Sequence, residues 1–172
     1  HLICGKHNNL TSSDQLKCIR MLMKEKINLE TTNGRSWRCI QYVCCSYNKM
    51  DSKDQLQAIR ELIEYGININ TCDDNNIPPL HDLLTGENNL NQVDQILAIK
   101  LLIDHGADVM MIKNGVPMLT FIFSRANLSE IDLKQIIESL KRQGFDNDRI
   151  RYCVEQTHIT IHKRSTILSL LN

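Results

Sequence analysis

The sequence is poor in proline, alanine and aromatic side chains. Its 172 residues include 3 prolines, 4 alanines and 1 tryptophan, and aromatic residues make up 5% of the chain. No run of about 18 apolar residues occurs, which excludes a membrane-spanning helix. The 20 basic residues balance 20 acidic ones, so the chain lacks the positive charge typical of nucleic-acid-binding proteins. The composition therefore favours a folded domain with neither a nucleic acid nor a membrane as its partner.

The ends and the cysteines bear on where the protein acts. The first residues, HLICGKHNN, contain no initiator methionine and no signal-peptide pattern, and we expect the chain to be a fragment that starts inside a structural element. The seven cysteines form no CxxC pair and leave one over. Cys18 and Cys39 fall on apolar-periodic stretches, where a thiol acts as a small hydrophobe. A reducing cytoplasm or nucleus is expected rather than secretion.

One pattern recurs along the chain at a nearly constant spacing. The segments DQLKCIRML, DQLQAIREL, DQILAIKLL and DLKQIIESL start at Asp14, Asp54, Asp94 and Asp132, with spacings of 40, 40 and 38 residues. Each segment ends alike, in LMKEKIN, LIEYGIN, LIDHGAD and LKRQGFD. Self-similarity at a fixed period is typical of repeat proteins. We therefore expect a solenoid of repeated units.

Each unit is predicted to contain an amphipathic helix. In the second unit Leu56, Ile59, Leu62 and Ile63 fall on one face of a helix, and the opening aspartate is expected to cap its first turn. Gly66, Gly106 and Gly144 then provide left-handed stops, for which the first unit substitutes Lys26. Turn-forming runs such as 73–76 and 113–115 predict short hairpins, and prolines in 78–79 and 116–119 predict the start of the next helix.

These residues resemble ankyrin repeats. The run from Gly66 to His81 is similar to the family's G-A-D-V-N…T-P-L-H pattern, and 106–109 match its first four residues outright. The resemblance implies that His81 caps its helix and that His1 occupies the same position in a preceding unit. Gln41 and Thr120 replace this histidine elsewhere, which leaves the capping there open. The expected fold class is all-α, an ankyrin-repeat solenoid of stacked helix pairs with short hairpins and long inter-helix loops.

The units depart from the family in length, and the departure is informative. Ankyrin units have about 33 residues, whereas the spacings here are 38 to 40. The surplus lies in asparagine-rich loops between the paired helices, and the chain has 21 isoleucines and 16 asparagines, a bias typical of an A/T-rich genome. Such loops resemble those of poxvirus ankyrin-repeat proteins. The resemblance covers about four repeats over residues 1–147.

The C-terminal part fits the repeat less well. We expect one short helix over residues 148–156 and the start of a truncated ankyrin-like repeat at 164–171, with an irregular hairpin region at 152–163 between them. His158, His162 and Cys153 have a spacing that allows zinc binding, but no fourth ligand is evident. Two surface histidines are the preferred interpretation, and no metal or other cofactor is expected.

Other reactive side chains have structural explanations. Adjacent cysteines rarely form a disulfide, and Cys44 falls on an apolar helix face, so a core thiol is expected. The acidic pair 73–74 and the pair 104–105 recur where the repeat places a hairpin tip and a helix end. No nucleophile stands beside a base, and no phosphate-binding glycine pattern occurs. A catalytic function is not expected.

The resemblance instead implies binding of another protein by hairpin tips and exposed first-helix faces. Trp37 is the leading candidate because tryptophan and arginine dominate interface energetics, with local packing under the hairpin as an equal alternative. The candidate partner-binding residues are Thr32, Arg35, Trp37, Arg38, Tyr42, Ser46, Cys72, Asp74, Asn75, Thr85, Met111, Lys113, Asn114 and Arg125.

The viral resemblance also implies a function. Poxvirus ankyrin proteins act as host-range and immune-evasion factors, and many have a C-terminal F-box-like PRANC segment that recruits a Skp1–cullin ubiquitin ligase. The expected function is non-catalytic capture of a host antiviral or innate-immune protein in the host cytoplasm or nucleus. The ligase would be reached through a segment outside this sequence. A cellular ankyrin scaffold or regulatory adaptor, and an enzyme with a regulatory ankyrin arm, are the alternatives.

Overall fold

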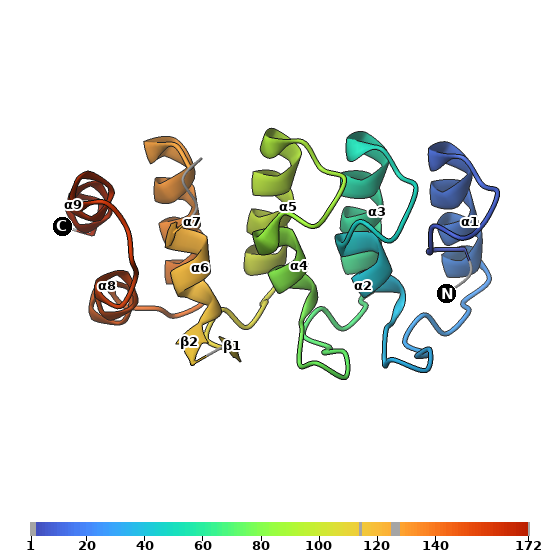
Figure 1. Ribbon diagram of the computed structural model, residues 1–172, viewed down its shortest axis with the longest axis horizontal. Helices are drawn as coiled ribbons and strands as arrows, with labels where there is room; N and C mark the ends of the chain where they lie inside the picture. The colour runs from blue at the N-terminus through green and yellow to red at the C-terminus, as the bar shows by residue number, and fades with distance from the viewer. Residues whose placement is uncertain (1–2, 114, 125–127, 172) are drawn as a thin grey trace. The chain divides into compact units, whose positions relative to one another are not determined.

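The computed structural model describes residues 3–113, 115–124 and 128–171, and within these ranges the protein is all-α (Figure 1). The described residues form nine α-helices and one short two-stranded sheet, which confirms the predicted all-α class. His1 lies outside the described residues. The chain divides into two compact units, His1–Leu102 and Ile103–Asn172, and each is described by itself.

Unit 1 alternates long and short helices. The long helices are α1 (Ser12–Lys24), α3 (Ser52–Tyr65) and α5 (Gln92–Asp104), whose last two residues open unit 2; the short ones are α2 (Cys39–Cys44) and α4 (Pro79–Thr85). Helix α1 packs beside α3, α2 packs beside α4, and α2 also contacts α3. In Figure 1 the long helices of this unit form one row and the short helices a second row.

The apolar face of each long helix provides the core of this arrangement. In α3 the side chains of Ala58, Ile59 and Leu62 are fully buried and Ile63 is nearly so. Burial of a leucine or isoleucine side chain stabilises a fold by about 1.5–3 kcal/mol. The short helix α2 contributes Ile40 and other apolar side chains to the same core.

The helix starts differ from the prediction in one detail. The repeated aspartates do not occupy the N-cap; the caps lie three residues earlier, at Thr11, Asp51 and Ser129. Each cap side chain accepts a hydrogen bond from the backbone N–H of the third helical residue, which satisfies one of the unpaired donors of the first turn. The aspartates Asp14 and Asp54 are those third residues.

The predicted left-handed stops are confirmed. Gly66, Gly106 and Gly144 have φ angles of 89°, 90° and 87°, and Lys26 takes the equivalent position with φ 53°. A residue with a side chain is strained by about 1–2 kcal/mol in this left-handed backbone conformation. The end of α1, at Lys26, is therefore less favourable than the end of α3, at Gly66.

Replacing Lys26 with glycine is expected to stabilise unit 1. Relief of the strain exceeds the additional entropy of the unfolded chain, which costs about 0.4–1 kcal/mol, and a net gain of about 0.5–1 kcal/mol follows. Urea unfolding followed by the fluorescence of Trp37 measures this gain. Lys26→Ala removes the same side chain but keeps the strain, so an equal gain from Lys26→Ala would contradict the explanation.

Unit 2 begins with a small sheet and continues with four helices. Strands β1 (Ile112–Lys113) and β2 (Val116–Pro117) are antiparallel, and α6 (Met118–Ser124), α7 (Glu130–Arg142), α8 (Asn147–Glu155) and α9 (Ile161–Ser169) follow. Residues 116–117, predicted to open a helix, are thus a strand, and α6 begins at Met118.

The C-terminal segment is more regular than predicted. The short helix predicted at 148–156 is confirmed as α8, but the irregular hairpin predicted at 152–163 is wrong, because only residues 156–160 separate α8 from α9. Thr160 caps α9 through a hydrogen bond from Lys163 N–H, which starts that helix three residues before the predicted position.

None of the helices in the described ranges has the length and apolarity required to cross a membrane.

Candidate functional site

A repeated glutamine fixes the framework of unit 1. The side chain of Gln55 is fully buried and donates to the carbonyl oxygens of Val43 (2.7 Å) and Cys45 (3.1 Å) at the end of α2. Its Oε1 accepts from Asn89 N–H at 3.0 Å. Gln15, forty positions earlier, makes equivalent bonds, donating to Gly5 O and accepting from Lys49 N–H. Gln55 therefore joins α3 to the end of α2 and to the loop before α5, and Gln15 joins α1 to the turn at Gly5 and to the loop before α3.

A repeated asparagine fixes the inter-helix loops. Asn48 donates to the carbonyl oxygen of Cys45 at 2.6 Å and accepts from Met50 N–H at 2.8 Å. Asn8 and Asn88 accept in the same way from the N–H groups of Leu10 and Leu90. At these positions asparagine satisfies backbone groups of a tight loop. Its abundance is thus partly a folding requirement, which corrects the interpretation from genome composition alone.

Three aromatic rings gather on one side of this framework. The ring centroid of Trp37 lies 5.1 Å from that of Tyr42 and 5.5 Å from that of Tyr47, with interplanar angles of 73° and 84°. Edge-to-face arrangements of this kind add about 0.5–1.5 kcal/mol per pair beyond burial. Asn33 orients Tyr42 by donating to its hydroxyl at 2.6 Å. Half-buried Trp37 is therefore held in a defined position.

The next loop of unit 1 holds the indole from the other side. Trp37 Nε1 donates to Asp73 Oδ2 at 3.1 Å, while Asp73 Oδ1 accepts from the N–H groups of Asn75 (2.8 Å) and Ile77 (2.9 Å). Ser36 Oγ also donates to Asp74 at 2.5 Å. The loop before α2, residues 30–38, and the loop before α4, residues 70–77, which contains the predicted turn at 73–76, are thus joined by side-chain hydrogen bonds into one surface.

A pocket of about 460 Å³ opens beside the three rings. Lys6 extends over Tyr47, with its Nζ 4.2 Å from the ring centroid, and Arg35 lies on the loop that leads to Trp37. Lys6, Arg35 and Tyr47 are exposed, and neither cation forms an ion pair with any residue in the described ranges. We call this the aromatic pocket; its lining residues are Gly5, Lys6, His7, Asn33, Gly34, Arg35, Trp37, Tyr42 and Tyr47.

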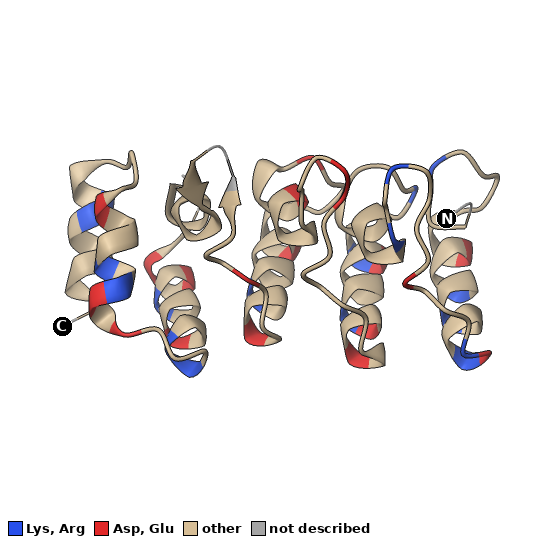
Figure 2. Ribbon diagram, turned by 90° about the horizontal axis from the view of Figure 1, so that it is seen from below, with Lys and Arg blue, Asp and Glu red and all other residues tan. Residues whose placement is uncertain are grey.

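The two joined loops differ in charge, as Figure 2 shows by the basic colour on the loop before α2 and the acidic colour on the loop before α4. Arg35 and Arg38 belong to the first loop, and Asp73 and Asp74 to the second. Both acids are engaged by Trp37 and Ser36, and Arg38 pairs with Glu30 at 3.3 Å. The charged groups of this surface that carry no ion pair within the described residues include Lys6 and Arg35.

The structure brings most of the predicted partner-binding residues of unit 1 into this region. Thr32, Arg35, Ser46, Asp74, Asn75 and Thr85 are exposed, and Trp37, Arg38, Tyr42 and Cys72 are half-buried. For Trp37 the local-packing alternative is confirmed, since its indole is hydrogen-bonded and its ring packs on two tyrosines. Its ring nevertheless lines the aromatic pocket, so packing and ligand contact are compatible.

The sequence reasoning missed Lys6, Asn33, Tyr47 and Asp73 as members of this site. A sequence signal was available for Lys6 and Tyr47. His7 and Tyr47 are forty residues apart, so successive inter-helix loops place the segment around Lys6 beside Tyr47. The role of Asp73 required the distance between two loops and had no sequence signal.

The predicted residues of unit 2 are less completely described. Met111 is half-buried and its carbonyl accepts from Met118 N–H at 2.9 Å. Lys113 lies in β1, but its side chain, Asn114 and Arg125 fall outside the described residues.

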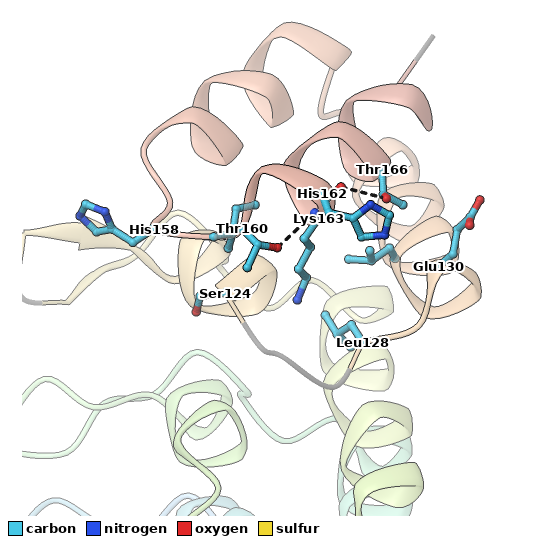
Figure 3. Close-up of a pocket in the computed structure, with 10 residues that line it drawn as sticks. Ser124, Leu128, Glu130, His158, Thr160, His162, Lys163 and Thr166 are labelled. Atoms are coloured by element: carbon cyan, nitrogen blue, oxygen red, sulfur yellow. Dashed lines mark hydrogen bonds between the residues drawn. The ribbon is translucent and has the colours of Figure 1, made fainter.

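A second pocket lies within unit 2, and Figure 3 shows its residues. His158 and His162 both line it but point to opposite sides, and the hydroxyl of Thr166 donates to His162 O at 3.1 Å. Cys153 is fully buried, with its thiol 4.0 Å from Met110 Sδ. In the described part of the chain no three histidine, cysteine or acidic side chains converge on a metal position. His158 and His162 are both exposed, as their interpretation as surface residues predicts.

The predicted core thiol is confirmed. Cys44 is fully buried, and burial, with Asp82 nearby, raises the pKa of its thiol well above the ordinary value. Burial likewise raises the pKa of Cys45 to about 12. A buried thiol with a raised pKa is unreactive because the thiolate is the nucleophile.

Helix α2 has Gln41 where another repeat has His81, and the glutamine side chain caps the start of the helix. Gln41 Oε1 accepts from the backbone N–H of Arg38 at 2.6 Å. Thr120 makes a different bond at the start of α6, where its hydroxyl donates to Pro117 O at 2.7 Å. A side chain other than histidine therefore caps a backbone N–H at the start of α2.

No family model and no curated protein matches this chain.

Proposed function

We propose that this chain is a non-catalytic protein-binding module built from ankyrin-like repeats. The observation that carries the proposal is the joined surface of loops 30–38 and 70–77, where Trp37 is held by Asp73 while its ring still lines an accessible pocket. Tryptophan in a defined position beside arginine is the composition of an interface hot spot. The equivalent bonds of Gln15 and Gln55 support the ankyrin-like repeat, since they join neighbouring segments of successive repeats in the same way.

The biological setting follows from the sequence resemblance. The module captures a host antiviral or innate-immune protein for a poxviral host-range or immune-evasion factor. A Skp1–cullin ubiquitin ligase, recruited by an F-box-like segment of the parent protein, then directs the captured protein to degradation. The long inter-helix loops and the repeat spacing of 38 to 40 residues support this setting over a cellular ankyrin scaffold.

Affinity purification of the full-length protein from host cells tests the proposal. We expect recovery of one host target together with Skp1 and cullin. Trp37→Ala with Arg35→Ala is expected to lower recovery of the target about tenfold or more, since hot-spot truncations cost about 2 kcal/mol or more, and to leave ligase recovery unchanged. Lys24→Ala with Lys53→Ala, two exposed side chains of α1 and α3, is the matched control.

Two results would contradict the proposal. Cytoskeletal or membrane-channel partners, without ligase components, would favour the cellular scaffold. Equal loss of the target from both pairs of substitutions would remove the loop surface as the binding site. The asparagine-rich loop at 88–91 is unsuitable as a control, because Asn88 and Asn89 hydrogen-bond to the framework of unit 1.

A further inference from the structure

The aromatic pocket combines apolar walls with unpaired positive charge. Trp37, Tyr42 and Tyr47 provide the walls, and Lys6 and Arg35 are the charged side chains among its described lining residues. A pocket of about 460 Å³ is within the range of about 300–1,000 Å³ typical of ligand sites. None of the described lining residues carries an acidic side chain.

The charge of the lining decides between two classes of ligand. Cages of tryptophan and tyrosine commonly bind quaternary ammonium groups through their ring faces. Here Lys6 already occupies the face of Tyr47 at 4.2 Å, so a second cation would meet both a filled face and two like charges. The carboxylate of Asp73 is not among the lining residues, and its oxygens already accept hydrogen bonds from Trp37, Asn75 and Ile77, so a second cation in the pocket would have no direct contact with it.

We propose that the aromatic pocket binds an acidic peptide segment of the partner, in which an aromatic or large apolar side chain enters between the rings and flanking carboxylates pair with Lys6 and Arg35. This inference rests on the proposed protein-binding function and names the chemistry of the partner. An aromatic side chain buries about 150–250 Å², which supplies the affinity. The carboxylates supply orientation and faster association.

The single tryptophan of the chain makes the pocket directly observable. Fluorescence emission and the indole N–H resonance of Trp37 both report contact with its ring. The probe is a short capped peptide in which one phenylalanine is flanked by aspartates. Saturable changes in both signals are expected, and binding should weaken as salt is added, because exposed charges are screened.

Substitutions test the role of the two cations. Lys6→Glu with Arg35→Glu is expected to weaken binding of the aspartate probe about tenfold, as expected for two exposed charge pairs. Lys6→Arg with Arg35→Lys keeps the charges and should bind nearly as well as the unmodified protein. Lys24→Glu with Lys53→Glu gives the same change in net charge at exposed positions outside the pocket and should leave binding unchanged. The urea midpoint verifies that each variant folds.

Charge-reversed probes keep the test decisive even if a variant fails to fold. A peptide with trimethyl-lysine or lysine in place of the aspartates keeps the phenylalanine and is expected to change the Trp37 signals of the unmodified protein only at concentrations about tenfold or more above those of the aspartate probe. Tighter binding of the trimethyl-lysine probe than of the aspartate probe would overturn the proposal. Failure of the aspartate probe, while a host target is still captured through Trp37, would overturn this inference and leave the proposed function intact.

Discussion

Replacing Gln55 with alanine is expected to lower the free energy of unfolding of unit 1 by about 3 kcal/mol. The substitution removes three hydrogen bonds, to Val43 O, Cys45 O and Asn89 N–H. A buried polar group without a partner costs about 1–3 kcal/mol. Asn48 still donates to Cys45 O, and Asn89 is exposed and can bond to water, so the loss is less than three full penalties.

Urea unfolding followed by Trp37 fluorescence measures this loss in the unit that contains the substitution. Gln57→Ala is the matched control, because Gln57 lies on the same helix and, within the part of the chain that the structure describes, donates only to the side chain of Glu61, at 2.8 Å. That control should lower the free energy by about 0.5 kcal/mol or less. Similar losses from Gln55 and Gln57 would show that the repeated glutamine is not a structural link.

Replacing Asp82 with asparagine is expected to stabilise the protein at pH 8 and to leave its stability unchanged below about pH 4. Asp82 lies on α4, where burial, followed by the charges of Asp73 and Glu87, raises the pKa of its carboxyl to about 7. Between about pH 4 and pH 7 the folded state therefore holds a proton that the unfolded state has released. The free energy of unfolding consequently falls as the pH rises through this window.

Asparagine carries no charge at any of these pH values, so the free energy of unfolding of Asp82→Asn does not fall in this way as the pH rises. With a discount for the partial exposure of Asp82, the gain at pH 8 is about 2 kcal/mol. Urea midpoints of the two proteins from pH 4 to pH 8 measure it. Glu64→Gln removes one negative charge from an exposed position of α3 and should give no pH-dependent gain. A constant difference between Asp82→Asn and the unmodified protein across the range would contradict the raised pKa.

Sequence periodicity predicted the helices well where an apolar face had to be buried. The repeated segments at 14, 54, 94 and 132 all lie in long helices, and the glycine stops have left-handed φ angles. The predictions were less accurate for polar residues. The repetition predicts the aspartates as caps, whereas Thr11 and Asp51 cap these helices, because several polar residues near a helix start can serve as the cap and only the backbone register selects one.

The glutamine that follows each repeated aspartate was visible but unexplained by periodicity. A glutamine in a helix is normally compatible with solvent, and nothing local indicates that Gln55 is fully buried. Its partners, Val43 and Asn89, are 12 and 34 residues away. Such bonds become visible only when successive repeats are packed together, since they join one repeat to the next within unit 1.

Trp37 shows most clearly what each level of organisation determined. The sequence by itself determined the all-α class, the period of the repeated helices and the loop on which Trp37 lies, because apolar spacing and turn residues act over a few neighbouring positions. Only the tertiary structure decided that Asp73 holds its indole, that Tyr42 and Tyr47 pack against its ring, and that Lys6 reaches the same pocket. Trp37 and Asp73, for example, are 36 residues apart in the sequence. Hydrophobic packing of the helices, rather than any local preference, brings such segments together.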